Sequence, residues 1–197
     1  MSAETDHDRV AAGIAQSAAT LERLREPGHV ATIVGAAAII ADALRQGGKL
    51  LLFGNGGSAA DAQHIAAELV GRFLLERAPL PALALADNGA SVTAIANDYT
   101  FVDVFARQVA GLGVPGDVVL AISTSGSSPN VLAGVAEARA RDMHTIGLTG
   151  ADGGALASAV DVCIAVPADS TPRIQEAHTV VGHLLCEIVE RELARRP

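Results

Sequence analysis

The chain has 197 residues, of which 50% are hydrophobic and 3% aromatic, and its formal net charge is -8. A chain of this length is expected to form one domain and to bury roughly 70% of the surface that its unfolded state exposes. The acidic excess argues against nucleic acid as a partner, because binding to phosphate backbones requires an excess of Lys and Arg.

The N-terminal part of the chain is predicted to be helical. Apolar residues recur at helical spacing over residues 8–24 and again over 30–44, before Gly47 and Gly48 end the pattern. The acidic N-terminus lacks the charged-then-apolar layout of a signal peptide, and the uncharged apolar stretch at 30–41 is too short to span a bilayer. We therefore expect a cytoplasmic protein with no membrane partner.

Five short apolar runs follow, each flanked by turn-forming residues and separated from the next by enough chain for a helix. They cover residues 49–53, 81–85, 117–122, 144–148 and 161–166. Continuous rather than alternating apolarity is typical of strands buried on both faces, as in a parallel sheet covered by helices. Strands that alternate with helices predict a doubly wound, flavodoxin-like α/β fold in three layers, with a five-stranded parallel sheet.

The end of the chain is predicted to be one long closing helix, from Thr171 to about Arg195, because Pro172 suits a first helical turn. No linker or internal repeat divides the sequence. We therefore predict a single domain in three parts, with N-terminal helices over 1–47, an α/β core over 48–170 and the closing helix over 171–197.

The chain contains two cysteines, Cys163 and Cys186. The first falls in a predicted strand and the second in the closing helix, both among apolar residues. Cysteines in such surroundings are most often buried free thiols, and a cytoplasmic protein rarely keeps a disulfide. We therefore expect no disulfide between them.

The loop after the first strand could bind an anion. Ligands of a doubly wound sheet bind outside the carboxyl ends of the strands, and residues 54–61, Gly-Asn-Gly-Gly-Ser-Ala-Ala-Asp, open a helix there. The glycines allow close approach of a ligand, and Ser58 and Asp61 suit a helix start whose free N–H groups attract anions. A plain strand-to-helix turn is an alternative. So is the dinucleotide fingerprint G-x-G-x-x-G/A, although Asp87 comes late for its acidic residue.

The loop after the third strand gives a stronger indication of phosphate. Residues 123–130 read Ser-Thr-Ser-Gly-Ser-Ser-Pro-Asn, and five of the first six carry a hydroxyl. A capped helix start needs one hydroxyl, whereas a phosphate accepts hydrogen bonds from several hydroxyls and from helix N-terminal amides. Lys49 is the single lysine of the chain, which disfavours a nucleotide triphosphatase with a P-loop. We therefore expect this loop to bind a phosphate through uncharged hydroxyl and amide groups and not through a lysine.

A cluster on two helices suggests a metal or acid–base site. His64 and Glu68 are four residues apart and share a helix face, and Gln175 and His183 differ by about 80° around the closing helix, whereas His178 points away from His183. Such side chains suit zinc or proton transfer, but a solvated helix face has the same spacing. Asn97 and Asp98 either line the same cleft or cap the next helix.

Taken together, these motifs resemble the sugar-isomerase (SIS) domain family, and within it the phosphoheptose isomerase branch. The resemblance covers nearly the whole chain. It is carried by residues 54–64, 67–69, 96–98, 123–126 and 173–178, with His183 beyond. It implies a homotetramer with sites at subunit boundaries, a phosphosugar substrate, one zinc ion per subunit and no organic cofactor.

The resemblance also implies roles for individual residues. Glu68 and His183 match the catalytic acid–base pair. The positions that match zinc ligands are His64, Glu68, Gln175 and His183. The positions that match substrate contacts are Asn55, Gly56, Gly57, Glu68, Asn97, Asp98, Ser123, Thr124, Ser125, Ser128 and Gln175.

The implied reaction is the conversion of sedoheptulose 7-phosphate to D-glycero-D-manno-heptose 7-phosphate through a cis-enediol. The main alternative is a non-catalytic relative of the same fold that binds the replication initiator or senses a phosphosugar. Relatives of that kind replace the catalytic Glu and the final His, whereas Glu68 and His183 are both present here. A dinucleotide-dependent oxidoreductase would explain neither the hydroxyl-rich loop nor the His/Glu/Gln/His set.

Overall fold

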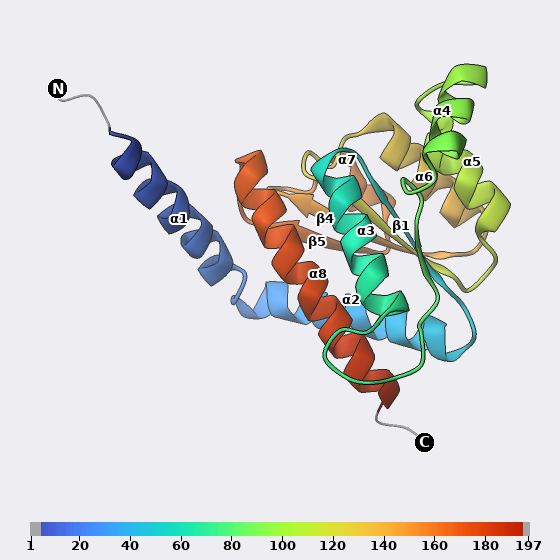
Figure 1. The fold of residues 1–197 in the computed structure, drawn as a ribbon, viewed down its shortest axis with the longest axis horizontal. Coiled ribbons are helices and arrows are strands. Elements are labelled where there is room, and N and C mark those ends of the chain that lie inside the picture. Colours follow the sequence, from blue (N-terminus) through green and yellow to red (C-terminus); the bar gives the residue numbers. More distant parts are fainter. Residues whose placement is uncertain (1–4, 195–197) are drawn as a thin grey trace.

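The computed structural model describes residues 5–194 of the chain, in which two N-terminal helices precede alternating strands and helices (Figure 1). The helices are α1 Asp6–Arg23, α2 Pro27–Arg45, α3 Gly57–Val70, α4 Gly89–Asp98, α5 Asp103–Leu112, α6 Pro129–Ala140, α7 Gly154–Ala159 and α8 Thr171–Ala194. The strands are β1 Leu50–Gly54, β2 Ala82–Ala84, β3 Val118–Ser123, β4 His144–Gly150 and β5 Val162–Val166. Arg195, the predicted end of the closing helix, lies outside the described residues.

The strands form one parallel sheet in the order β2-β1-β3-β4-β5. The prediction of a doubly wound, five-stranded parallel sheet is confirmed. The strand order reverses between β1 and β3, and it is flavodoxin-like rather than the 3-2-1-4-5-6 order of dinucleotide-binding folds. β2 is shorter than the predicted 81–85 run, because this edge strand pairs on one side and leaves Leu83 42% exposed.

The sheet is the middle of three layers. Alternate side chains of each buried strand point to opposite faces, so that Leu50 and Leu52 join one core and Leu51 and Phe53 the other. The first core is closed by α2, α3 and α8, and the second by α5, α6 and α7. This arrangement explains the continuous apolar runs, because each strand is covered on both faces.

One helix among the described residues, α2, is long and apolar enough by length and composition to cross a membrane. The uncharged part of this helix, residues 30–41, is too short to span a bilayer, and the helix is longer because it continues through Asp42 to Arg45. Its inner face packs into the first core through Ile33, Ala36 and Ile40, which are buried. A helix in the core of a folded domain can be equally long and apolar, so the composition of α2 is explained by its packing against the sheet and α8.

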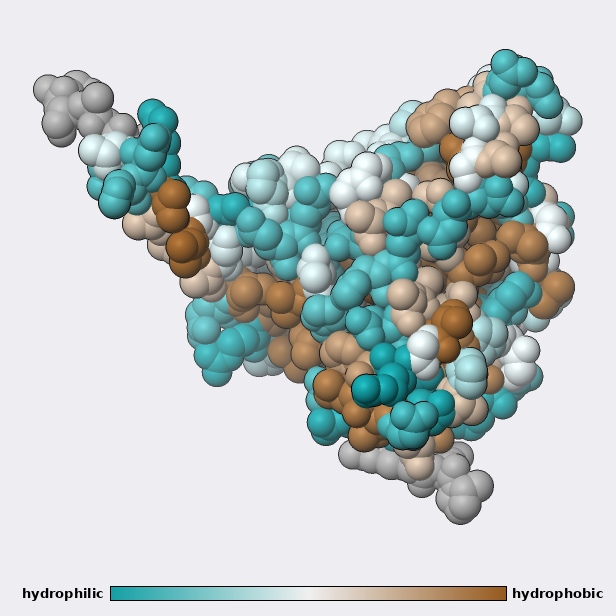
Figure 2. Space-filling view, viewed as in Figure 1, coloured by the Kyte–Doolittle hydropathy of each residue, from teal (hydrophilic) through white to brown (hydrophobic). Residues whose placement is uncertain are grey.

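The first helix, α1, projects from the body of the molecule as an arm (Figure 1). It is attached near the start of α8, where Arg173 Nη1 donates to the carbonyl oxygen of Gly13 at 2.6 Å. On the same stretch of α1, the side chains of Val10 and Ile14 are not covered, and these residues are 63% and 67% exposed. Figure 2 shows hydrophobic residues along the arm and in the hollow where the arm joins the body.

Both cysteines are free thiols, as predicted. Cys163 in β5 is half-buried, and Cys186 in α8 is buried beside Ile65. Burial, reinforced by the nearby Glu68 charge, raises the pKa of the Cys186 thiol to about 12. This thiol therefore stays protonated and acts as a small apolar side chain.

Candidate active site

Two loops meet where the strand order reverses. Asn55 follows β1 and Asn130 lies in the first turn of α6, and each side-chain amide donates to the amide oxygen of the other at 2.8 Å. Asn130 is 3% exposed, so this pair joins the glycine-rich loop to the serine-rich loop below the surface. Asn55 was a predicted site residue, whereas the role of Asn130 was missed although it ends the serine-rich segment.

The hydroxyl groups of the serine-rich loop face one another. Ser123 Oγ lies 3.0 Å from Ser128 Oγ and 3.4 Å from Ser125 Oγ. Ser128 is the N-cap residue of α6, yet its side chain makes no capping hydrogen bond. The hydroxyls therefore converge on one another instead of capping the helix, which argues against the capped-helix interpretation of this segment.

The turn between β4 and α7 packs against the backbone of the serine-rich loop. Gly126 has a φ of +61°, and a Cβ there would collide with the carbonyl group of Gly153. The carbonyl oxygen of Gly126 accepts from the backbone N–H of Leu156 at 2.8 Å, and that of Thr124 accepts from Gly150 at 3.2 Å. The loop is thus held in one shape by backbone contacts, which leaves its hydroxyls available to a ligand.

Helices α3 and α8 lie side by side and bring distant residues together (Figure 1). Near their N-terminal ends, the Gln175 amide lies so close to Gly57 that a Cβ there would collide with it. One turn further along, Thr179 Oγ1 donates to Asp61 Oδ1 at 2.9 Å. The next turns bring His183 to His64, so that Gln175 and His183 face α3 as the helical spacing predicted.

Three side chains that could transfer protons or bind a metal meet between these helices: His64, Glu68 and His183, called the histidine group below. The Nε2 atoms of His64 and His183 are 2.8 Å apart, and His64 Nε2 is 3.7 Å from Glu68 Oε1. One ligand atom from each residue lies within 4.8 Å of the other two. The Phe73 ring stacks on His183 with centroids 5.4 Å apart, a contact that sequence reasoning missed because nothing in the local pattern marks it.

His178 takes no part in this group and is fully buried on the other side of α8. Its Nε2 lies 3.0 Å from the carbonyl oxygen of Thr149, so Nε2 carries the proton that is donated. Its Nδ1 has no hydrogen-bond partner among the described residues. Burial lowers the pKa of His178, against smaller opposing effects of the Thr149 carbonyl and Asp61.

Asn97 and Asp98 lie apart from the rest of the predicted site within one chain. Both are exposed at the end of α4, where Asn97 Nδ2 donates to Asp98 Oδ1 at 2.9 Å. Figure 1 shows α4 well separated from α8. Neither side chain caps α5, since that helix starts after Val102 without a side-chain capping hydrogen bond.

Comparison with known proteins identifies the family of this site. Residues 14–150 match the SIS domain model. A phosphoheptose isomerase of Rhodospirillum rubrum is 55% identical over 161 residues, which cover 82% of this chain and 86% of the relative. The structure of a phosphoheptose isomerase from Neisseria gonorrhoeae is 44% identical, with a TM-score of 0.90 over 95% of this chain and 100% of that one.

A second structure, a phosphoheptose isomerase from Francisella tularensis, is 39% identical, with a TM-score of 0.90 over 95% of this chain and 99% of that one. These likenesses extend over the helices, loops and sheet that carry the predicted site. They confirm the resemblance stated from the motifs, including that the chain is an enzyme of the isomerase class. The chain therefore belongs to the SIS domain family, among the phosphoheptose isomerases.

Proposed function

We propose that this enzyme interconverts sedoheptulose 7-phosphate and D-glycero-D-manno-heptose 7-phosphate with the assistance of zinc. The observation that carries the proposal is the His64, Glu68 and His183 group. His64 and Glu68, on the helix that starts at the glycine-rich loop, and His183 of α8 have ligand atoms within 4.8 Å of one another. The seven helical steps from Gly57 to His64 rise about 10 Å. An open-chain heptose phosphate can bridge that length between the glycine-rich loop, which Asn55 joins to Asn130 of the serine-rich segment, and the proton-transfer site.

The substrate phosphate would bind the serine-rich loop. Ser123, Ser125 and Ser128 present converging hydroxyls, and the first backbone N–H groups of α6 add a favourable dipole for an anion. The sugar would extend from this loop along the helix pair. The other proposed contacts are Asn55, Gly56, Gly57, Glu68, Asn97, Asp98, Thr124 and Gln175.

Glu68 and His183 would carry out the proton transfers. One takes the proton from C1 of the ketose while the other protonates the C2 oxygen, which gives the cis-enediol. The proton then returns to C2, and loss of the O1 proton forms the aldehyde, so that the sugar is isomerised without net gain or loss of atoms. Their ligand atoms belong to one cluster, close enough for both to serve the same two carbons.

The donor atoms fit a zinc ion. Zinc takes imidazole nitrogen and carboxylate oxygen at about 2.0–2.2 Å, so ligand atoms of a tetrahedral site lie about 3.3 Å apart. The observed separations of 2.8 Å and 3.7 Å lie on either side of that value. His64, Glu68 and His183, with Gln175 as fourth donor, would hold one ion per subunit. Bound zinc would polarise the substrate carbonyl as a Lewis acid.

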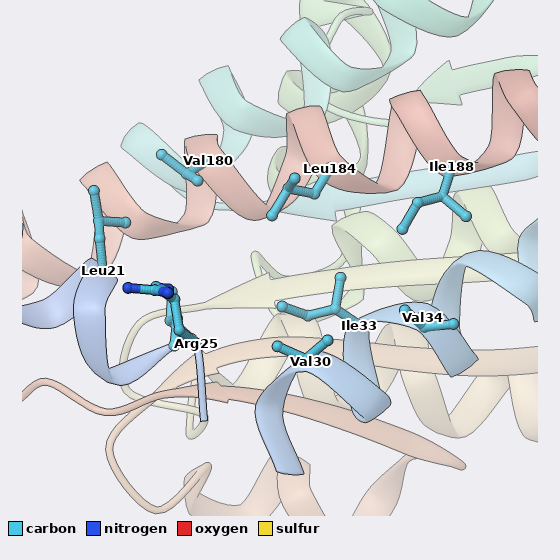
Figure 3. Close-up of a pocket in the computed structure, with 9 residues that line it drawn as sticks. Leu21, Arg25, Val30, Ile33, Val34, Val180, Leu184 and Ile188 are labelled. Atoms are coloured by element: carbon cyan, nitrogen blue, oxygen red, sulfur yellow. The ribbon is translucent and has the colours of Figure 1, made fainter. Parts of the chain in front are cut away.

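A homotetramer with sites at subunit boundaries is part of the proposal. Asn97 and Asp98 lie apart from the histidine group in one chain, so a neighbouring chain would bring them to it. An apolar groove between α1, α2 and α8, lined by Leu21, Val30 and Leu184 among others, offers a surface for such contact (Figure 3). The exposed Val10 and Ile14 add to this surface.

We also propose that the enzyme acts in the cytoplasm, with no nucleic-acid or membrane partner.

A proton NMR assay in D₂O tests the reaction and the metal together. Purified protein is incubated with sedoheptulose 7-phosphate before and after chelation, and again with zinc restored. We expect aldose signals with deuterium at C2, lost on chelation and recovered with zinc. Tight binding of the sugar phosphate without turnover in any metal state would contradict the proposal and indicate a sensor.

A further inference from the structure

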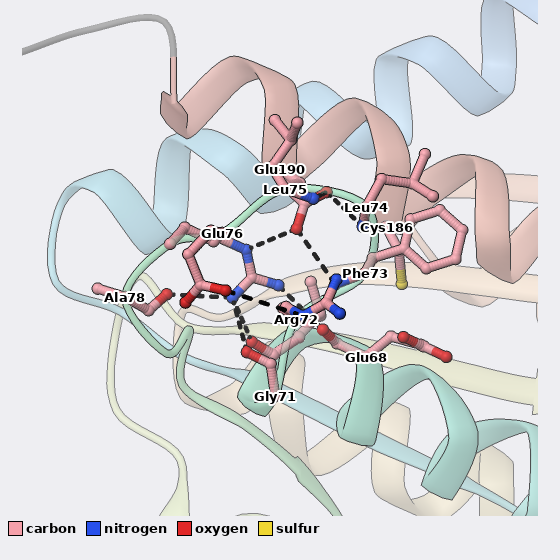
Figure 4. A network of polar contacts seen from close by, with 12 residues as sticks. Glu68, Gly71, Arg72, Phe73, Leu74, Leu75, Glu76, Ala78, Cys186 and Glu190 are labelled. Atoms are coloured by element: carbon pink, nitrogen blue, oxygen red, sulfur yellow. Dashed lines mark hydrogen bonds and ion pairs between the residues drawn. The ribbon is translucent and has the colours of Figure 1, made fainter.

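A buried ion pair joins the segment after α3 to α8, and neither of its residues has a role assigned above. Arg77 Nε is 3.1 Å from Glu190 Oε1, and the two side chains are 8% and 1% exposed. Arg77 lies in the segment after α3, and Glu190 lies on α8 two helical turns beyond His183, on the same face. Figure 4 shows the Glu190 side chain pointing from α8 toward the segment that follows α3.

Arg77 holds the end of the helix that carries Glu68. Its Nη2 donates to the backbone carbonyl of Glu68 at 2.9 Å, and its Nη1 donates to that of Leu69 at 2.8 Å. These carbonyls belong to the last turn of α3, where the helix itself supplies no N–H partner. A cation there is also favoured by the helix dipole. The guanidinium thus fixes the backbone of Glu68 itself.

Glu190 holds the segment that packs on His183. Its carboxylate accepts from the backbone N–H groups of Phe73, Leu74 and Leu75 at 3.2, 2.8 and 2.8 Å, besides the Arg77 contact. The Phe73 ring, fixed in this way, stacks on the imidazole of His183. Burial alone would raise the pKa of Glu190, but the backbone donors and Arg77 together bring it below its ordinary value, so the carboxylate is charged.

We propose that Arg77 and Glu190 are positioning residues for the isomerase reaction: through one buried ion pair they fix the Glu68 backbone and the ring packed on His183. This inference rests on the proposed function of Glu68 and His183. A buried ion pair is often no more stabilising than an apolar pair of similar volume, so stability alone accounts poorly for it. Fixing both members of an acid–base pair accounts for the contact of Arg77 with the Glu68 carbonyl and for that of Glu190 with the Phe73 backbone.

The test compares Glu190→Gln with a matched variant at the residue that precedes β3, Asp117. Asp117 is also buried and paired, accepting from Lys49 Nζ at 2.5 Å and from the backbone of Val114 at 2.9 Å. Asp117→Asn therefore removes an equally buried charge whose partners, Lys49 and Val114, take no part in the histidine group. Both proteins are studied well below the temperature at which either begins to unfold.

We expect Glu190→Gln to lower kcat and zinc affinity by about 10- to 100-fold, as for other groups that support metal ligands. KM for sedoheptulose 7-phosphate should stay within about twofold, because the serine-rich loop is untouched. Asp117→Asn should leave kcat and zinc affinity within about twofold of the starting protein. Equal losses in the two variants would overturn the positioning role.

A readout independent of the reaction keeps this inference separate from the proposed function. Phe73 shifts the ring protons of His183 through its ring current, and His183→Asn identifies those signals. We expect the shift to be lost in Glu190→Gln and kept in Asp117→Asn, and an unchanged shift in both would overturn the inference. If the starting protein shows neither turnover nor zinc binding, the proposed function fails while this shift still decides the positioning role.

Arg77→Lys provides a second variant should Glu190→Gln fail to fold. Lysine keeps the charge, but its single ammonium cannot serve both the α3 carbonyls and Glu190 as the planar guanidinium does. We expect kcat and zinc affinity to fall in the same direction as in Glu190→Gln, and the His183 signals to shift. Values equal to those of the starting protein would overturn the inference.

Discussion

The serine-rich loop and the histidine group are assembled in opposite ways. The loop hydroxyls lie within six consecutive residues, Ser123 to Ser128, and reach one another through a single turn. His64 and His183 are 119 residues apart and meet because α3 and α8 pack side by side. The first region depends on local backbone shape, whereas the second depends on the packing of two helices and on the groups that fix their ends.

The two regions also differ in the chemistry that they offer. Hydroxyls and helix amides bind a phosphate equally well before and during the reaction, so they contribute uniform binding. Imidazole and carboxylate groups exchange protons with the reacting carbons and act on the barrier itself. Substitutions in the loop should therefore change KM, and substitutions in the histidine group should change kcat.

The largest expected effect is that of Glu68→Gln. The amide keeps the size of the carboxylate but cannot accept a proton, so we expect kcat to fall by about 10²- to 10⁴-fold. Binding of the sugar phosphate, measured by calorimetry, should change little. Near-normal turnover with zinc still bound would show that Glu68 is a ligand and not the base.

A smaller effect, of a different kind, is expected in the loop. Removing the facing hydroxyls in the double variant Ser123→Ala and Ser128→Ala takes two donors from the phosphate. Hydrogen bonds to charged groups contribute about 1.5–3 kcal/mol each, so KM should rise at least tenfold while kcat changes much less. Steady-state kinetics measure both values. Ser158→Ala, at an exposed hydroxyl on α7, is the matched control.

A fall in kcat with an unchanged KM in the double variant would contradict the division between the two regions. It would mean that the loop acts on the reacting carbons and not on the phosphate. The same kinetics on Ser158→Ala should reproduce the values of the starting protein, because its hydroxyl donates to the carbonyl of Ala155 within its own helix.

What could be predicted from the sequence follows the same contrast. The buried strands are marked by continuous apolar runs, and β1 and β3 were placed to within one residue. The serine-rich loop is a local pattern, which is why a phosphate site could be predicted there from the sequence. The His64 and Glu68 pair is visible from helical spacing, but its distance to His183 depends on how α3 and α8 align. Spacing along one helix contains no such information.

The residues that sequence reasoning missed are those with distant partners. Arg77 and Glu190 are 113 positions apart, and each looks like a solvated charge on its own segment. Phe73 likewise gives no local sign of its contact with His183. β2 is shorter than the predicted run over 81–85, because an edge strand pairs with a neighbour on one side only and fewer of its residues are held in the sheet. Only the packed fold defines these features.

The smallest expected effect concerns His178, buried on α8 between Gln175 and His183. Its pKa is lower in the folded chain than the ordinary 6.5, so the unfolded chain binds a proton first as the pH falls. Its contribution to stability is therefore complete above about pH 6.5 and is lost below it, by at most about 1.4 kcal/mol per pH unit.

His178→Gln tests this expectation, because the amide nitrogen of glutamine can still donate to the Thr149 carbonyl but does not titrate. Urea denaturation at several pH values between about 5 and 7.5 gives the free energy of unfolding of both proteins. We expect the difference between them to narrow as the pH falls, while the other histidines affect both proteins equally. Parallel curves would mean that His178 is reached by solvent protons without unfolding. That result would contradict the closed packing of β4 against α8, which buries His178 about one and a half turns before His183.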